Sequence, residues 1–279
     1  MALNGVSTEA VMIPKTLPEA QSALKLCAHM PDERFDLTAC ALACAIHENP
    51  DRDITSAFTA LEELTCLAQE RKPTSAEQLG QLIYGDLGFV GAGHTNYDPA
   101  NADLIHILTK RVGPPVGLGV VIWRHVARLT QANVSGVDNP GHFLLRLETK
   151  EGPIFINSLT GGAVFDDAGV TRLEERAGLS AFSKSILLAV SDRVLALRLQ
   201  ANLAVRAQAI GDDEAWFRTA QRRAILAPNN HEIAHDFSKA AEALGQIQLA
   251  LEWARHADQL NNGKPHEGNR ASILHHKLN

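Results

Sequence analysis

His142 is the side chain of this sequence that is best placed for catalysis. It lies in the segment Asn139-Pro140-Gly141-His142-Phe143, where a strand-like run begins after a turn, and Asn157 ends the next strand-like run. A histidine can take a proton from a nucleophile, and an Asn or Asp bonded to one ring nitrogen orients it, as in Cys-His-Asn triads. The pair therefore predicts the orienting half of a nucleophilic site. A histidine that only hydrogen-bonds within a hairpin is the simpler interpretation of His142 taken alone.

A second candidate is the motif His231-Glu232-Ile233-Ala234-His235. On a helix this spacing puts two imidazoles one turn apart, where they can hold zinc while the glutamate acts as a base. Here the apolar face of the helix leaves both histidines on the other side, and no strand is adjacent to frame a peptide substrate; that face consists of Ile233, Phe237, Ala240, Ala241 and Leu244. We therefore expect a solvated or ligand-facing helix surface, with no metal and no cofactor.

The cysteines do not form a recognisable site. Cys27, Cys40, Cys44 and Cys66 have no CxxC spacing, which argues against structural zinc, and four in so long a chain do not make a disulfide scaffold. A cysteine beside Ala and Leu on a helix is usually a small apolar core residue. The glycines Gly113, Gly117 and Gly119 match no phosphate-binding loop.

Composition restricts the class of protein. The chain has 279 residues, and 26 Lys and Arg against 32 Asp and Glu give a formal charge of -6. This charge argues against a general nucleic-acid binder, which needs a basic face. The first residues lack a basic segment followed by an apolar run, and the uncharged stretch 112–123 is too short to span a membrane. We expect a cytoplasmic protein that binds neither nucleic acid nor membrane.

Helices are expected on both sides of the segment that holds His142. Residues 1–72 form a helical N-terminal region, because apolar residues recur at helical spacing on either side of Asn49-Pro50. Residues 189–262 fit a helix-turn-helix period of 34 residues, with units 197–230 and 231–264 and Gly245 at a turn. Two such units cannot bury a core alone, so they should pack on the middle of the chain. Residues 263–279 are expected to be a mobile tail.

The middle segment, 73–188, should hold the site. Thr74 with Glu77 predicts a capped helix through Tyr84, and Asp98-Pro99 predicts the start of another. A glycine-rich loop, GDLGFVGAG at 85–93, lies between them, and apolar spacing predicts a further helix over 118–129. The runs 142–147 and 153–157 flank Lys150-Glu151-Gly152, which predicts a β-hairpin.

Taken together, these segments resemble the SirB-type bacterial family, which has a transglutaminase-like core and C-terminal tetratricopeptide-like helices. The resemblance runs from about Phe35 to Leu260, and its most specific pieces are GDLGF (85–89), NYDPANADLIHILTKRVGPPVGL (96–118), GVDNPGHFLLRLE (136–148) and IFINSLTGG (154–162). It implies an α+β fold: a mostly helical chain with a papain/transglutaminase-like core that carries a small antiparallel sheet, plus C-terminal helical hairpin repeats.

The resemblance also implies positions for a triad. The superfamily uses a Cys at a helix N-terminus, where the thiol pKa is lowered, and then His and Asp on adjacent strands. By order along the chain, the nucleophile position falls at Pro115 or Val116, and neither side chain is a nucleophile. His142 matches the histidine. Asn157 falls at the Asp position, followed by Ser158 where the family usually has Pro.

Two functions are favoured, and a zinc peptidase built on His231 and His235, which would need stoichiometric metal, is a third possibility. The first is a pseudo-enzyme that acts as a protein-binding or peptide-binding regulatory module. Its cleft would lie around His142, Asn157 and loop 85–93, and the repeat surface would be lined by Glu232, His235, Lys239 and Glu242. The alternative is a cysteine-protease or transglutaminase-type hydrolase or acyltransferase that uses His142 with an unorthodox nucleophile, either a low-pKa thiol or a serine such as Ser135 or Ser158. Alternation along a strand places Asn157 and Ser158 on opposite faces, which counts against Ser158.

Overall fold

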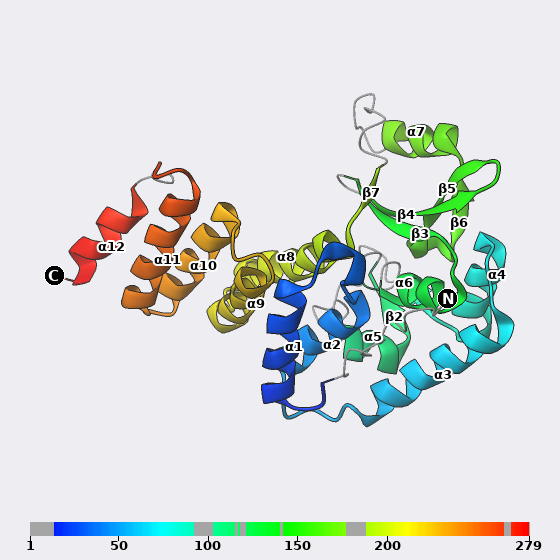
Figure 1. Ribbon diagram of the computed structural model, residues 1–279, viewed down its shortest axis with the longest axis horizontal. Helices are drawn as coiled ribbons and strands as arrows, with labels where there is room; N and C mark the ends of the chain where they lie inside the picture. Colours follow the sequence, from blue (N-terminus) through cyan, green and yellow to red (C-terminus); the bar gives the residue numbers. More distant parts are fainter. Residues whose placement is uncertain are drawn as a thin grey trace, which may run out of the picture.

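Helices make up most of the chain, and a five-stranded antiparallel sheet lies toward the end of the molecule that is opposite the C-terminal helices (Figure 1). The structure is a computed structural model that describes residues 14–91, 103–114, 117, 121–139, 142–176, 188–264 and 269–278. The described chain begins with N-terminal helices, continues through the sheet region and ends in helical hairpins that lead away from the sheet (Figure 1). This arrangement confirms the predicted α+β class of a mostly helical chain with a small antiparallel sheet.

Three helices open the described chain: α1 (Leu17–His29), α2 (Leu37–Glu48) and α3 (Thr55–Arg71). α2 is central, because every residue from Leu37 to Ile46 is buried. Its alanine and cysteine side chains are small enough to let other helices approach closely. α2 therefore packs against α1, α5 (Leu104–Lys110), α6 (Trp123–Thr130) and α8 (Asp192–Ile210).

Two helix starts differ from the sequence prediction. α4 (Ala76–Gly80) is capped by Ser75 with Gln78, one residue after the predicted Thr74 and Glu77, and continues as the wider helical turn η2 (Gln81–Asp86). α5 begins at Leu104, where the Asp103 side chain accepts a hydrogen bond from the backbone of His106 at 3.0 Å. The predicted start at Asp98-Pro99 lies outside the described residues.

The sheet has the strand order β6-β5-β4-β3-β7. The predicted hairpin is present as β4 (His142–Thr149) and β5 (Gly152–Asn157), with Leu145 opposite Ile156. β3 (Val134–Asn139), β6 (Ala163–Phe165) and β7 (Ala189–Val190) complete it, so the last strand lies just beyond position 188, where we expected the core segment to end. A separate parallel pair joins β1 (Val90–Gly91) to β2 (Val112–Gly113).

Each face of the sheet packs against different helices. One face joins the large core that includes α6, through Val134, Leu145, Leu147 and Ile156. The other carries a smaller cluster of Val137, Leu144, Phe155 and Val170, the last of which belongs to α7 (Asp167–Arg176). α7 therefore covers one face while α6 supports the other.

The C-terminal part consists of two helical hairpins, α8 with α9 (Asp213–Leu226) and α10 (His231–Ala243) with α11 (Ile247–Leu260). Gly211 and Gly245 form the two turns, each at positive φ, and their numbers differ by the 34 residues of the predicted period. The first hairpin packs on the N-terminal helices as well as on the sheet, since α9 contacts α1 and α2 while α8 contacts α2 and β3. No helix in the described part of the chain is both long and apolar enough to cross a membrane.

Part of the predicted mobile tail is instead helix α12 (Arg270–Leu278), which packs against α11. Leu274 is fully buried there, and Arg270 donates to the Ser238 hydroxyl at 2.9 Å and to Glu242. The polar composition of this segment predicts mobility, but composition does not show tertiary contacts. Leu274 and the guanidinium of Arg270 hold α12 against the second hairpin.

Two arginines join the sheet region and the N-terminal helices to the first hairpin. Arg124 of α6 makes a bidentate ion pair with Asp192, the first residue of α8, at 2.7 and 2.8 Å. Arg193 donates to the carbonyl of Cys27 at 3.0 Å and to that of Leu226 at 3.2 Å, and so links the ends of α1 and α9. Charge-assisted bonds of this kind fix the position of α8 against the rest of the fold.

Candidate functional site

The structure places the predicted triad positions at one end of the sheet. β4 begins at His142, whose backbone pairs with Asn139, and β5 ends at Asn157, which pairs with Ala163. Pro115 and Val116, the predicted nucleophile positions, lie outside the described residues, as does the side chain of His142. The described part of the glycine-rich loop includes β1, which lies beside Ser158–Thr160. Val90–Gly91, near the end of this loop, and the residues that follow β5 are therefore neighbours.

The strand register separates Asn157 from α6. Alternate residues of a strand share a face. Phe155 belongs to the cluster on the α7 side, and Asn157 is in phase with it along β5. α6, which follows the predicted nucleophile position, packs on the opposite face. Alternation therefore does not direct Asn157 toward the start of α6.

Aromatic side chains fill the space between the start of α6 and the end of β5. The Trp123 indole donates to the Tyr84 hydroxyl at 3.0 Å, and that hydroxyl donates to the Ser158 carbonyl at 3.1 Å. Trp123 is fully buried, and burial raises the pKa of Tyr84 well above its usual value. Gly162, at a φ of 83°, lets Tyr84 approach, since a Cβ there would lie 3.1 Å from the ring. Ser158, one of the alternative nucleophiles, is itself buried.

The predicted residues of α10 have different surroundings. His231 is the first residue of the helix, after the Asn230 cap, and no group of three or more His, Cys, Asp or Glu suited to a metal occurs within the described ranges. Glu232 and Lys239 are exposed, and His235 is half-buried. Glu242 pairs with Arg270 and with Lys277, the latter at 2.6 Å, so its carboxylate is held by α12 rather than facing an open surface.

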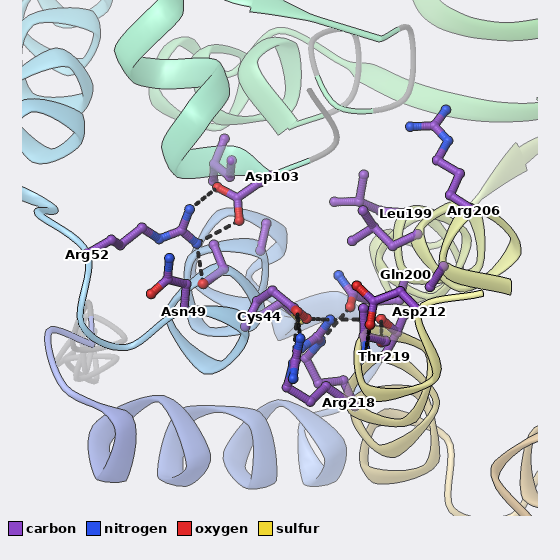
Figure 2. A pocket seen from close by; sticks show the side chains of 18 of the residues that line it. Cys44, Asn49, Arg52, Asp103, Leu199, Gln200, Arg206, Asp212, Arg218 and Thr219 are labelled. Carbon is purple, nitrogen blue, oxygen red and sulfur yellow. Dashed lines mark hydrogen bonds and ion pairs between the residues drawn. The ribbon is translucent and has the colours of Figure 1, made fainter. Parts of the chain in front are cut away.

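A pocket that the sequence did not predict lies between α2 and α5 on one side and α8 and α9 on the other (Figure 2). Its volume is about 290 Å³. Apolar side chains form much of its wall: Ala41, Ala45, Leu104, Leu199, Leu203, Ala207, Ile210 and Ala215. Four arginines also line it: Arg52, Arg206, Arg218 and Arg222.

Ion pairs hold the walls of the pocket together (Figure 2). Glu48 of α2 pairs with two residues of α9, with Arg218 at 2.9 Å and with Arg222 at 2.6 Å. Arg222 is only 1% exposed, and it also donates to Gln200 at 2.7 Å. At the other end, Arg52 binds both oxygens of Asp103, at 2.8 and 2.6 Å. A buried cation needs such partners, because an unpaired charge is costly away from water.

Titration of the groups around the pocket reflects this environment. The pKa of His47 falls to about 4, first because the ring is buried and then because the Arg222 guanidinium lies nearby. The Glu48 carboxylate tends to raise the pKa of His47, but it does not outweigh burial and Arg222. Partial burial lowers the pKa of Arg206 to about 10.

The cysteines behave mainly as core residues. Cys27, Cys40 and Cys44 are buried where α1 meets α2, and Cys66 is exposed on α3. Hydrogen bonding to Cys27 and Cys44, together with burial, raises the pKa of Cys40, whereas the hydrogen bond with Cys40 lowers the pKa of the buried Cys27. A raised pKa opposes thiolate formation, which a nucleophilic cysteine needs. Cys44 reaches the wall of the pocket.

Comparison with known proteins places this fold in a family. The sequence model of the transglutaminase-like superfamily matches residues 52–201, more than half of the chain. A UPF0162 protein of Xylella fastidiosa (strain Temecula1) is 31% identical over 241 residues, which cover 80% of this chain and 83% of that protein. The chain belongs to the transglutaminase-like superfamily and to the UPF0162 family.

Other matches differ in how much they cover. The UPF0162 protein of another Xylella fastidiosa strain, 9a5c, is 30% identical, over 78% of this chain and 81% of its own. The UPF0162 protein of Vibrio cholerae is 30% identical over 50% of this chain and 54% of its own. Among solved structures, the crystal structure of menin that reveals the binding site for Mixed Lineage Leukemia (MLL) protein gives a TM-score of 0.42 at 12% identity, covering 96% of this chain and 76% of that one. That score is too low to support an argument.

The pocket of this UPF0162 protein extends beyond the matched superfamily segment. Arg52, Asp103 and Leu199 lie within residues 52–201, whereas Glu48 precedes the segment and Arg218 follows it. Sequence reasoning missed these residues because they are distant in the chain and meet only when α9 packs on α2. The available signal was the pair Arg218 and Arg222, one helical turn apart on a helix that must also bury apolar residues.

Proposed function

We propose that this UPF0162 protein is a non-catalytic member of its superfamily that binds a protein or peptide partner. The observation that carries the proposal is the segment before α6: residues 112–123, VGPPVGLGVVIW, contain no Cys, Ser or Thr. Covalent acyl transfer needs a thiol or hydroxyl at this place, activated by the adjacent base. Without such a group, His142 and Asn157 are remnants of a triad.

The local packing supports the same proposal. Asn157 is in phase with Phe155 on the α7 side of the sheet, and Tyr84 and Trp123 occupy the space at the start of α6. Both features are compatible with a scaffold that no longer needs to bring a thiol and an imidazole together.

We assign the chain to the SirB type, with its C-terminal helices as tetratricopeptide-like repeats. The support is the 34-residue separation of Gly211 and Gly245 and the close packing of α11 through its small residues Ala250, Ala254 and Ala257. Helical hairpins of this kind expose surfaces that bind extended peptides. In this role Glu232, His235 and Lys239 belong to the partner-facing side of α10, and Glu242 serves the intramolecular contact with α12.

The non-catalytic part of the proposal is tested by the rate of thiol alkylation against pH. Each of the four cysteines is followed by mass spectrometry in the wild type and in His142→Ala. We expect no cysteine to react with an apparent pKa well below the free-thiol value of about 8.5, and no rate to depend on His142. A cysteine whose low pKa disappears in His142→Ala would show that the protein is an enzyme.

The binding part is tested by selecting a random peptide library displayed on phage against the full chain. We expect an enriched consensus whose synthetic peptide binds in solution, with an unrelated immobilised protein as the control. No enrichment above that control would contradict a peptide-binding role.

A further inference from the structure

α12 is attached to the rest of the molecule by a small set of contacts. It lies beside α11, on the far side of the second hairpin from α8 and α9 (Figure 1). α12 buries one side chain, that of Leu274, whereas α10 buries six and α11 buries four, so α12 contributes little to the core. A helix of nine residues is marginal in water on its own. The helical form of α12 therefore depends on these contacts, and loss of a few of them should release it.

The site that holds α12 has an apolar part and a buried hydroxyl. Leu274 packs into a cluster formed by both helices of the second hairpin: Ala241, Ala250, Leu251 and Ala254. One turn earlier, Nε of Arg270 donates to the Ser238 hydroxyl at 2.9 Å, and Nη2 donates to the Ser238 carbonyl at 3.2 Å. Ser238 is fully buried and gives its own proton to the Ala250 carbonyl at 2.7 Å, so its oxygen is left to accept from the guanidinium. The site therefore receives a donor next to an apolar side chain.

The same site is acidic. Glu242 binds Arg270 with one carboxylate oxygen and Lys277 with the other, the latter at 2.6 Å. The hydrogen bond from Lys277, and after it the charge of Arg270, lower the pKa of Glu242. Lys277 is half exposed, and ion pairs at the surface are weak and are screened by salt. Without α12, the site would present a carboxylate, a hydroxyl acceptor and an apolar patch, which together complement a basic and apolar segment.

This site continues the side of α10 that we assign to the partner. His235, Lys239 and Glu242 are four and three residues apart, so they share one side of the helix. Glu242 is the member of this row that α12 engages. A partner that follows the row along α10 would therefore compete with α12 for the same carboxylate.

We propose that α12 is an internal ligand, and that the partner is a protein helix that displaces it with the same pattern: a basic residue, an apolar residue four positions later and a second basic residue three positions after that. The inference rests on the proposed binding role and names the chemistry of the partner. Because α12 closes the site, a partner binds only the fraction of molecules in which α12 is released, and its apparent affinity falls by that fraction.

The site is tested with a fluorescein-labelled peptide of residues 269–278, followed by fluorescence anisotropy against the full chain. Leu274→Asp puts a charge at a fully buried apolar position and should release α12, whereas Ile273→Asp makes the same change at a neighbour that is 51% exposed. We expect the peptide to bind Leu274→Asp about tenfold or more tightly than it binds the wild type or Ile273→Asp. Equal binding to all three chains, or binding to none of them, would overturn the proposal.

Two further variants test the charges. Arg270→Glu places a second carboxylate beside Glu242 and should also open the site, which gives an independent result if circular dichroism shows that Leu274→Asp disturbs the second hairpin. In the opened chain, Glu242→Gln should weaken the peptide about tenfold, because hydrogen bonds between charged groups are about twice as strong as neutral ones. Unchanged affinity in Glu242→Gln would contradict the basic part of the pattern.

The partner is tested by repeating the phage selection with Leu274→Asp. We expect an enriched consensus in which an apolar residue lies between basic residues, and whose peptide competes with the labelled α12 peptide. A consensus peptide that binds without competing would overturn this inference and leave the proposed binding function intact, whereas no enrichment on either chain would contradict that function itself. A wild-type dimer in light scattering that Leu274→Asp abolishes would make a second copy the occupant and would also overturn the inference.

Discussion

His125 should make the folded state sensitive to mild acid. The imidazole lies between α2 and α3, with Nδ1 3.3 Å from the Thr38 hydroxyl and Nε2 3.0 Å from the Thr65 hydroxyl. Thr65 donates its own proton to the Leu61 carbonyl at 2.7 Å, so it must accept from Nε2–H, which leaves Nδ1 to accept from Thr38. The neutral ring thus satisfies both of its nitrogens, and burial lowers the pKa from 6.5 to about 4.

The direction of the pH effect follows from this shift. The unfolded chain binds the proton near pH 6.5 while the folded chain resists it down to about pH 4, so the contribution of His125 to stability is present above 6.5 and is lost as the pH falls toward 4. With about 1.4 kcal/mol for each unit of pKa difference, the loss is about 2 kcal/mol between pH 7 and pH 5 and about 3 kcal/mol by pH 4. His47, with its pKa also at about 4, adds a loss of the same sign in the same window.

Urea unfolding followed by circular dichroism at pH 7, 6 and 5 measures this dependence. His125→Gln should be less stable than the wild type at pH 7, because a poorer fit replaces the ring, but it should lose about 2 kcal/mol less than the wild type between pH 7 and pH 5. His29→Gln, at an exposed position at the end of α1, is the matched control and should keep the wild-type slope. An identical slope in His125→Gln and the wild type would refute the reasoning.

Two further substitutions test how the fold is held together. Arg193→Lys should lower the free energy of unfolding by about 3 kcal/mol, because an ammonium cannot reproduce the planar fork that reaches the carbonyls of Cys27 and Leu226. Denaturant unfolding of this variant is compared with that of the exposed control Arg34→Lys, and equal losses of stability would contradict the role of Arg193. Gly162→Ala should cost about 2 kcal/mol, since it adds a Cβ at positive φ and 3.1 Å from Tyr84; an unchanged thermal midpoint would show that the aromatic pair moves aside freely.

Local signals in the sequence predicted the elements well. The hairpin turn after β4 and the glycine at the turn of α10 and α11 were identified because turns and glycine positions are encoded within a few residues. The capping box of α4 lies one residue later than predicted, because both Thr74 with Glu77 and Ser75 with Gln78 have the spacing of a capping box, and serine is the better N-cap. α12 was missed because its stability comes from Leu274 and Arg270 in contact with the second hairpin.

The candidate site shows the limit of such reasoning. Sequence order predicts His142 and Asn157 on adjacent strands, and β4 does pair with β5, but it does not indicate which face of the sheet Asn157 occupies. That depends on which face α6 covers, and this is a property of the whole core. The pocket was beyond reach for the same reason, since Glu48 meets Arg222 only through helix packing across most of the chain.

Under the proposed function, the transglutaminase-like core has a positioning role. Arg124 at the sheet side of α6 fixes Asp192 at the first turn of α8, and Arg193 ties that same turn to the ends of α1 and α9. With its first turn fixed, α8 presents Leu199 and Leu203 to the pocket at a set distance from α2. Loosening α8 would therefore open the pocket on the side that supplies Leu199, Leu203, Ala207 and Ile210, so the transglutaminase-like core helps to shape it.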